Sequence, residues 1–175
     1  MDRFARALAF VFDVEGGFSD DRRDPGGMTN FGITAATLAR ARKRDPSLPW
    51  TVASINKDHA TAIYRADYWS AFGAEFCPPG LDLIYFDACV QHAPPSPQRW
   101  LQLAIGVPGD GVIGPVTRER LTALTPTGTR RAIIEFAAQR MRHYMMLDDD
   151  SRVDFGLGWS RRLCGCLAEA LAWTG

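Results

Sequence analysis

The sequence lacks a long hydrophobic run and an excess of charge of either sign. No apolar stretch approaches the roughly 18 residues that a membrane-spanning helix requires, so we expect no stable membrane insertion. The 175 residues carry 20 basic and 20 acidic side chains. Because nucleic-acid-binding domains usually have a basic excess, this balance argues against a dedicated nucleic-acid binder. We interpret the local charge clusters at 40–44 (basic) and 148–150 (acidic) as solvated surface.

Cysteine is scarce, and the few cysteines form no familiar motif. The four are Cys77, Cys89, Cys164 and Cys166. Their spacing matches no common zinc pattern, and Cys-Gly-Cys is not the Cys-x-x-Cys motif of redox proteins. We therefore expect reduced thiols with packing roles and no metal site.

The N-terminal segment does not have the pattern of a secretory signal. Asp2 lies near its start, Asp13 and Glu15 follow its apolar part, and no small-residue cleavage site is present. We expect a protein that is made in the cytoplasm and that needs another exit route for any work outside the membrane.

Helical periodicity is abundant, whereas internal repeats and low-complexity tracts are missing. Apolar spacing and turn residues predict eight helices, at 2–15, 35–44, 57–72, 81–92, 97–106, 115–124, 129–147 and 160–173. The segment 28–33 could pair as a β-hairpin. The predicted fold class is therefore mainly α, with one small β-hairpin near the N-terminus.

Glu15 occupies an unusual position at the end of the first predicted helix. It follows the apolar positions of that helix and precedes Gly16 and Gly17, which favour helix termination. Burial and the negative end of the helix dipole would both raise the pKa of its carboxyl group. A carboxyl group that stays protonated near neutral pH can donate a proton to a glycosidic oxygen.

A second carboxylate is needed nearby, and Asp24 is the preferred candidate. It begins the turn Asp-Pro-Gly-Gly, while Asp20 and Asp21 are rivals in a more exposed run. Thr29 or Asn30 could hold the attacking water by hydrogen bonding. In the alternative interpretation Glu15 only ends a helix and Asp24 only forms a turn, and the residues alone leave both interpretations open.

Two further pairs are candidate substrate contacts. Tyr68 and Trp69 could border a cleft as platforms for sugar rings, although aromatic residues at helical spacing are often core residues. Gln91 and His92 end the predicted helix 81–92, where a single histidine is often a surface residue without a catalytic role.

Several motifs occur together and in order along nearly the whole chain. They are Glu15-Gly16-Gly17-Phe18, Asp24-Pro25-Gly26-Gly27, Thr29-Asn30-Phe31-Gly32-Ile33-Thr34, Tyr64 to Trp69, Phe86-Asp87-Ala88, Leu101-Gln102 through Asp110 to Thr117, and Phe155 to Arg162. This set resembles glycoside hydrolase family 108, a family of lysozyme-like N-acetylmuramidases found as phage endolysins and secretion-helper muramidases.

The resemblance implies an α+β lysozyme-like fold, with the small β-hairpin region beside the catalytic cleft. It implies a catalytic region at 1–93 and a peptidoglycan-binding-like helical region at 94–175, packed together as one compact unit. Glu15 would be the catalytic acid and Asp24 the ionised partner, with Thr29 or Asn30 orienting water. The chain has Gln91-His92-Ala93 where the family leads us to expect an asparagine-rich stretch, so the substrate-contact role of this segment is open.

The implied reaction is hydrolysis of the β-1,4 bond between N-acetylmuramic acid and N-acetylglucosamine. We expect an inverting course, which requires carboxyl groups roughly 6.5–9.5 Å apart. We expect no cofactor, and a monomer that acts on peptidoglycan glycan strands in the periplasm after release with the help of a holin-like export partner. A non-catalytic peptidoglycan-binding module and a lytic transglycosylase are the alternatives.

Overall fold

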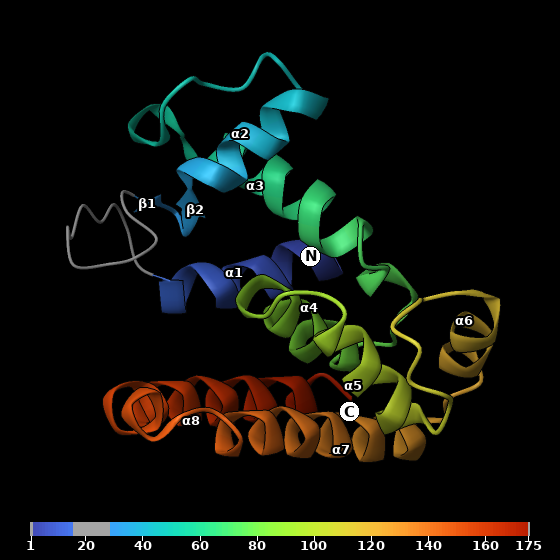
Figure 1. Cartoon of the computed structure of the whole chain (residues 1–175). Coiled ribbons are helices and arrows are strands. Elements are labelled where there is room, and N and C mark those ends of the chain that lie inside the picture. The colour runs from blue at the N-terminus through green and yellow to red at the C-terminus, as the bar shows by residue number, and fades with distance from the viewer. Residues whose placement is uncertain (1, 16–28, 175) are drawn as a thin grey trace. The chain divides into compact units, whose positions relative to one another are not determined.

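The chain forms two compact units in a computed structural model that describes residues 2–15 and 29–174. The units comprise Met1–Ala71 and Phe72–Gly175 (Figure 1). The division falls earlier than the boundary predicted at residue 93, because helix α4 (Leu81–Gln91) packs with the later helices. Each unit is described below by itself.

The first unit contains a small two-stranded sheet and three α-helices among its described residues. In chain order these elements are α1 (Arg3–Glu15), β1 (Thr29–Asn30), β2 (Ile33–Thr34), α2 (Ala35–Arg44), a 3₁₀ turn (Val52–Ser54), α3 (Lys57–Tyr64) and a π-helical segment (Arg65–Ser70). The apolar side of α1 is buried as predicted, with Phe4, Ala7, Leu8 and Val11 in the core.

Local sequence signals explain where the helices of the first unit begin and end. Thr34 caps α2 as predicted, since its side chain accepts a hydrogen bond from the backbone N–H of Thr37. Asn56 and His59 form a reciprocal capping box at the start of α3. The helix predicted at 57–72 is α-helical only to Tyr64 and then widens into the π-helical segment, an interruption that propensity does not reveal.

The second unit is a helical bundle around one buried helix. Its described elements are a 3₁₀ turn (Ala74–Phe76), α4, α5 (Ser96–Ile105), α6 (Pro115–Thr122), α7 (Pro126–Met145) and α8 (Asp149–Ala172). Helices α7 and α8 lie side by side, and α4 packs against both (Figure 1). Every residue from Leu81 to Cys89 is buried, so α4 is the central helix of this unit.

Helix α8 begins well before the predicted start at Ser160. Asp148 accepts a hydrogen bond from the backbone N–H of Ser151 and caps the helix, and Asp149 and Asp150 occupy its first turn. The acidic cluster is thus a helix start, where negative charge is favourable. The sequence did not predict this extension because it contains Gly156 and Gly158, and glycine is unfavourable inside a helix.

The described structure confirms the mainly α fold class with a small antiparallel hairpin. All four cysteines are free thiols, and three of them are buried, namely Cys77, Cys89 and Cys166. No described helix combines the length and apolar character that crossing a membrane demands.

Candidate functional site

Glu15 is the last residue of α1, as the sequence predicts. Its position is the carbonyl end of the helix, and the last turn contains no basic residue that would offset the negative helix dipole. The side chain of Glu15 and the whole of Asp24 lie outside the described residues, so their separation is not part of the described geometry.

Aromatic contacts hold the end of α1 against the hairpin. Phe12 lies one turn before the end of α1, and its ring is 5.8 Å from Phe31 and 5.7 Å from Tyr64, centroid to centroid. The Tyr64 hydroxyl donates a hydrogen bond of 3.0 Å to the Phe31 carbonyl oxygen. The helix end that carries Glu15 is therefore positioned relative to the hairpin by three packed rings.

The hairpin itself is a tight two-residue turn. Thr29 pairs with Thr34, and Asn30 pairs with Ile33. The turn residues Phe31 and Gly32 have φ of 52° and 73°, which places both in the left-handed region. A turn with positive φ at both central positions matches the twist of the flanking strands, so it fixes where Thr29 lies.

The structure shows a structural role for Asn30 in addition to the predicted one. Its side chain is buried, and its Nδ2 donates to the backbone carbonyls of Val52 at 3.2 Å and Ile55 at 3.0 Å. Both amide hydrogens are used in this way, so the side chain joins the hairpin to the 3₁₀ turn, and the predicted water-orienting role of its Oδ1 stays a prediction. Thr29 is half-buried and keeps the predicted water-orienting role as a hypothesis.

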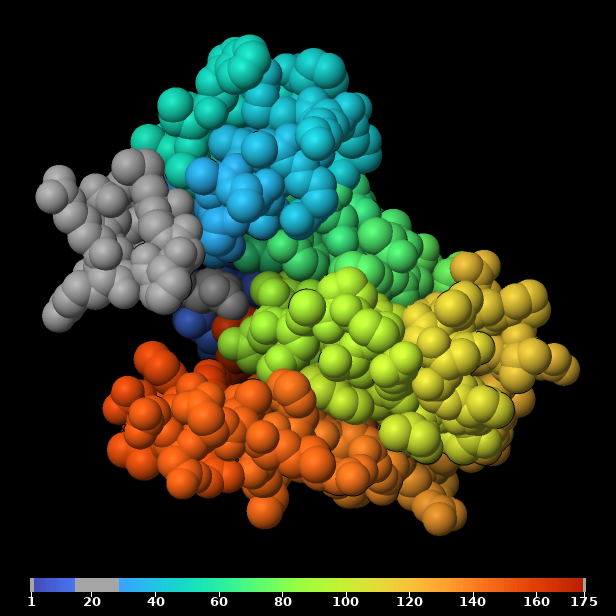
Figure 2. Space-filling view, viewed as in Figure 1, coloured from blue at the N-terminus to red at the C-terminus, as the bar shows by residue number. Residues whose placement is uncertain are grey.

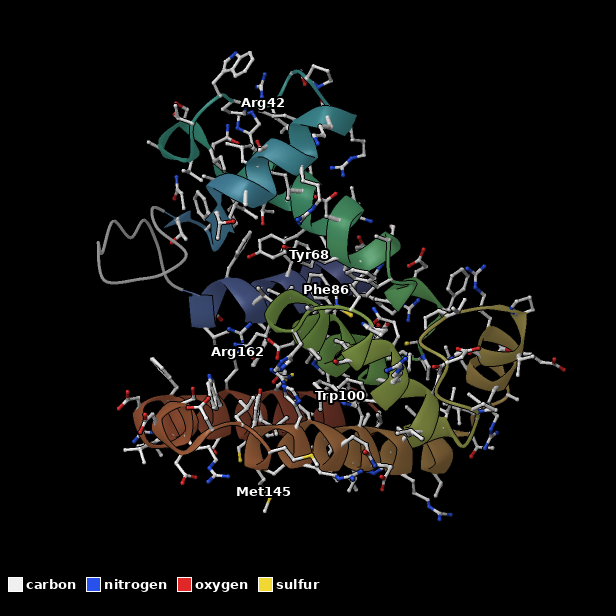
Figure 3. The ribbon with its side chains drawn as sticks, viewed as in Figure 1. Arg42, Tyr68, Phe86, Trp100, Met145 and Arg162 are labelled. Atoms are coloured by element: carbon white, nitrogen blue, oxygen red, sulfur yellow. The ribbon has the colours of Figure 1, made fainter. Side chains whose placement is uncertain are left out.

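The two aromatic candidates differ in exposure. Trp69 is 4% exposed and packs edge-on against Phe4 at 5.5 Å, so it is a core residue of the first unit. Tyr68 is half-buried, and its ring is 5.5 Å from that of Tyr64. Of this pair, Tyr68 has the exposure that a sugar platform needs (Figure 3).

Gln91 belongs to the second unit, where it lies beside a buried charge network. The carboxylate of Asp87 binds Arg140 through Oδ2, with a distance of 2.7 Å to Nη1. The same carboxylate accepts from Arg162 through Oδ1, at 2.9 Å from Nε and 2.7 Å from Nη2. Arg140 also donates to Gln91 Oε1 and, at 2.8 Å, to the Tyr144 hydroxyl.

Burial and the neighbouring Asp87 charge shift the pKa of Arg140 in opposite directions. Burial by itself lowers the pKa of this guanidinium, but the adjoining Asp87 carboxylate outweighs burial, so the pKa of Arg140 is raised. Arg140 therefore stays charged in the core, and its Nη2 holds the Gln91 side chain in one orientation.

His92 lies in an aromatic cluster next to this network. Its ring is 5.0 Å from Trp100 and 5.3 Å from His143, and its Nε2 is 3.4 Å from the Tyr144 hydroxyl. Burial first, and the Arg140 charge second, lower the pKa of His92 to about 3. His92 is thus a neutral imidazole near neutral pH, with one donor and one acceptor nitrogen.

A small pocket opens where these side chains meet. It has a volume of about 160 Å³ and is lined by Gln91, His92, His143, Tyr144, Leu147 and Trp159. The structure thus brings the predicted pair Gln91 and His92 together in one pocket, but with partners from α7 and α8 that sequence reasoning did not assign to a site.

Sequence reasoning missed the network because its members are far apart in the chain. Asp87, Arg140 and Arg162 come from α4, α7 and α8. The one available signal was an aspartate within an otherwise apolar helix, which requires a buried partner. Arg162, which is labelled in Figure 3, attaches α8 to α4 through its bonds to Asp87.

The segment Asp110 to Pro115 is held by one buried side chain. Gln102 Nε2 donates to Asp110 Oδ1 at 2.5 Å and to the Val112 carbonyl at 3.0 Å, and Gln102 Oε1 accepts from the Gly111 N–H at 2.7 Å. These bonds explain the turn as an architectural element. Within the described ranges, no group of histidine, cysteine and carboxylate residues is arranged as a metal site.

Comparison with known proteins gives a matching family model and several similar solved structures. A family model described as glycosyl hydrolase 108 matches residues 8–93, a range that contains the predicted catalytic residues and ends at the predicted region boundary. Among solved structures, the chain is similar to that titled "Structure of Brucella abortus SagA", with 34% sequence identity and a TM-score of 0.83. The match covers 98% of this chain and 95% of that chain. No curated protein matches.

Proposed function

We propose that this chain, which belongs to the glycosyl hydrolase 108 family, hydrolyses the β-1,4 bond between N-acetylmuramic acid and N-acetylglucosamine in peptidoglycan. Family membership makes the chain a glycoside hydrolase. We propose both the bond that is cleaved and the residues that cleave it. The observation that carries it is the position of Glu15, at the end of an α-helix that packs against a tight hairpin.

Glu15 is proposed as the general acid. The carbonyl end of α1 disfavours a carboxylate there, and no basic residue of the last turn offsets this effect. A carboxyl group kept protonated in this way can transfer its proton to the bridging oxygen as the glycosidic bond breaks. The leaving sugar then departs as a neutral alcohol.

The attacking water is proposed to be activated by Asp24 and oriented by Thr29. Thr29 lies on β1, whose position is fixed by the Phe31–Gly32 turn and by the Asn30 bonds to the following loop. Attack from the face opposite the leaving group would invert the anomeric carbon, which is the course that we propose. Asn30 supports this arrangement as a structural residue.

Analysis of the products from purified sacculi tests the proposal. We expect muropeptides with reducing N-acetylmuramic acid ends, identified by mass spectrometry, and NMR of the freshly released ends should show the inverted anomer. Products with 1,6-anhydro ends would instead identify a lytic transglycosylase. Binding to sacculi without any released product would identify a non-catalytic wall-binding protein.

A further inference from the structure

A row of aromatic rings runs along the paired helices α7 and α8 to the pocket at Gln91. Trp159 stacks on Tyr144 with ring centroids 5.3 Å apart and planes at 22°. Phe155, one helical turn earlier, lies 5.9 Å from Trp159 at 31°. Phe155 is 58% exposed and Trp159 is half-buried, so the row leads from the surface into the protein. Figure 2 shows the region where α7 meets α8 in orange on the viewed surface.

Two glycines keep the space beside this row open. Gly156 and Gly158 lie within α8, and a Cβ atom at either position would meet no heavy atom within 4 Å among the described residues. A glycine inside a helix costs about 1 kcal/mol relative to alanine. Internal packing in the described structure does not require these glycines, which is consistent with a ligand passing over this part of α8.

The pocket at the end of the row is large enough for one substituent of a sugar ring but too small for a whole sugar. Its volume of about 160 Å³ is well below the roughly 300 Å³ at which pockets begin to enclose a whole ligand. At about 30 Å³ for each water, it holds about five water-sized groups. A four-atom acetamido group fits this space, whereas a complete N-acetylated sugar does not.

The pocket also has the chemistry that an acetamido group requires. Gln91 accepts from Arg140 through Oε1, and among the described residues none accepts from its Nε2, which is therefore a fixed donor for a carbonyl oxygen. The Tyr144 hydroxyl accepts from Arg140, so its own proton can be donated to His92 Nε2. This arrangement leaves Nδ1 as the N–H of the neutral imidazole. Leu147 supplies an apolar wall for a methyl group.

We propose that Phe155, Trp159 and this pocket bind one N-acetylated sugar of a glycan strand. The apolar face of the sugar ring lies on Phe155 and Trp159, and its acetamido group enters the pocket beside Gln91. The choice of a glycan rests on the proposed function, and it agrees with the polar lining of the pocket, which a purely apolar partner would leave without hydrogen bonds.

Titration of the whole chain with an N-acetylglucosamine tetramer tests this inference. The Glu15→Gln background prevents hydrolysis, and NMR follows the indole N–H signal of Trp159, assigned among the five tryptophans by Trp159→Phe. We expect this signal to shift on binding. Phe155→Ser should raise the Kd about tenfold, because it removes a stacking surface. Because the Phe155 side chain is exposed, the substitution should leave the fold intact, which circular dichroism verifies.

The matched control is Leu157→Ser, which alters a residue of similar exposure on the same helix. It should change the Kd by less than about twofold, because Leu157 lines neither the row nor the pocket. A tetramer of glucosamine without acetyl groups should bind at least about tenfold more weakly, because the pocket would stay unfilled.

Equal binding by the Phe155 and Leu157 variants, or equal binding of the two tetramers, would overturn the inference. So would a Phe155→Ser variant that binds sugar normally but changes the sedimentation of the protein, since the row would then contact a second copy. Cleavage of sacculi by the chain with Glu15 intact is measured in parallel. Normal cleavage together with a Kd that Phe155→Ser does not change rejects the sugar site alone. Sugar binding at this site without any cleavage rejects only the proposed function.

Discussion

The Asp87 carboxylate lies 2.7 Å from the Arg140 guanidinium, and neither side chain is exposed to solvent. This pair connects the central helix α4 to α7, and Arg162 extends it to α8 through the other carboxylate oxygen. The same guanidinium orients Gln91 at the pocket. One buried carboxylate therefore holds three helices together and supports the candidate sugar site.

Asp87→Asn should be strongly destabilising. The substitution removes the negative charge that compensates Arg140 and Arg162, and breaking a buried pair typically costs about 3–5 kcal/mol. Urea unfolding followed by circular dichroism measures the change in the free energy of unfolding. The control is Asp149→Asn, which removes the exposed partner of Arg152 and should cost less than about 1 kcal/mol. Similar losses for both variants would contradict the role assigned to Asp87.

Asn30→Ala should reduce stability much more than catalysis. The variant leaves the Val52 and Ile55 carbonyls without their donor, at an expected cost of about 1–3 kcal/mol in the free energy of unfolding. The rate of sacculus cleavage, measured below the unfolding temperature, should fall by no more than about threefold relative to wild type.

Thr29→Ala should show the opposite pattern. Thr29 is half-buried, so stability should fall by less than about 1 kcal/mol, while loss of water orientation should lower cleavage by at least about tenfold. Wild-type cleavage by Thr29→Ala would remove this residue from the mechanism.

Glu15→Gln should fold normally and lose most of its cleavage of sacculi, by about a hundredfold or more, because glutamine cannot donate the required proton. Asp24→Asn should also lose much of the activity. Turbidity clearing of sacculi gives the rates, and circular dichroism verifies the fold. If Asp24→Asn keeps the wild-type rate, Asp20 and Asp21 become the candidates for the second carboxylate.

His92 should make the protein less stable in mild acid. Its folded pKa of about 3 lies below the unfolded value of roughly 6.5, so below pH 6.5 only the unfolded chain binds the proton. Stability is therefore complete above that pH and falls as the pH decreases, by up to about 1.4 kcal/mol for each pH unit.

Urea unfolding at pH 7 and pH 5 measures this slope in wild type and in His92→Gln. The variant should have a clearly flatter profile, with a remaining slope from His143, whose pKa is also lowered by burial. The carboxylates with lowered pKa, such as Asp110, lose their contribution only at lower pH. An unchanged slope in His92→Gln would contradict the burial of a neutral imidazole.

Periodicity and capping predicted most helices because these signals are local. The apolar side of α1 and the Thr34 cap are contained within a few neighbouring residues, and both predictions are confirmed. The prediction for the start of α8 was wrong, because two glycines outweighed an aspartate cap that lies several residues earlier. The π-helical segment after Tyr64 has no comparable local signal.

Candidate residues could be identified from the sequence, whereas their partners could not. The motifs around Glu15 and the hairpin indicated the family, which the comparisons confirm. Tyr68 and Trp69 could not be distinguished before the structure was known, because one helical pattern contains both and they differ in burial.

By itself the sequence determined the order of the helices, the hairpin and the place of Glu15 at a helix end, since each depends on residues within a turn or two of chain. Tertiary structure alone decided that Asn30 supports a loop, that Asp87 neutralises two distant arginines, and that Phe155 and Trp159 lead to the pocket at Gln91. The physical reason is that buried polar groups must find hydrogen-bonding partners, and folding brings those partners from positions 22 to 75 residues away.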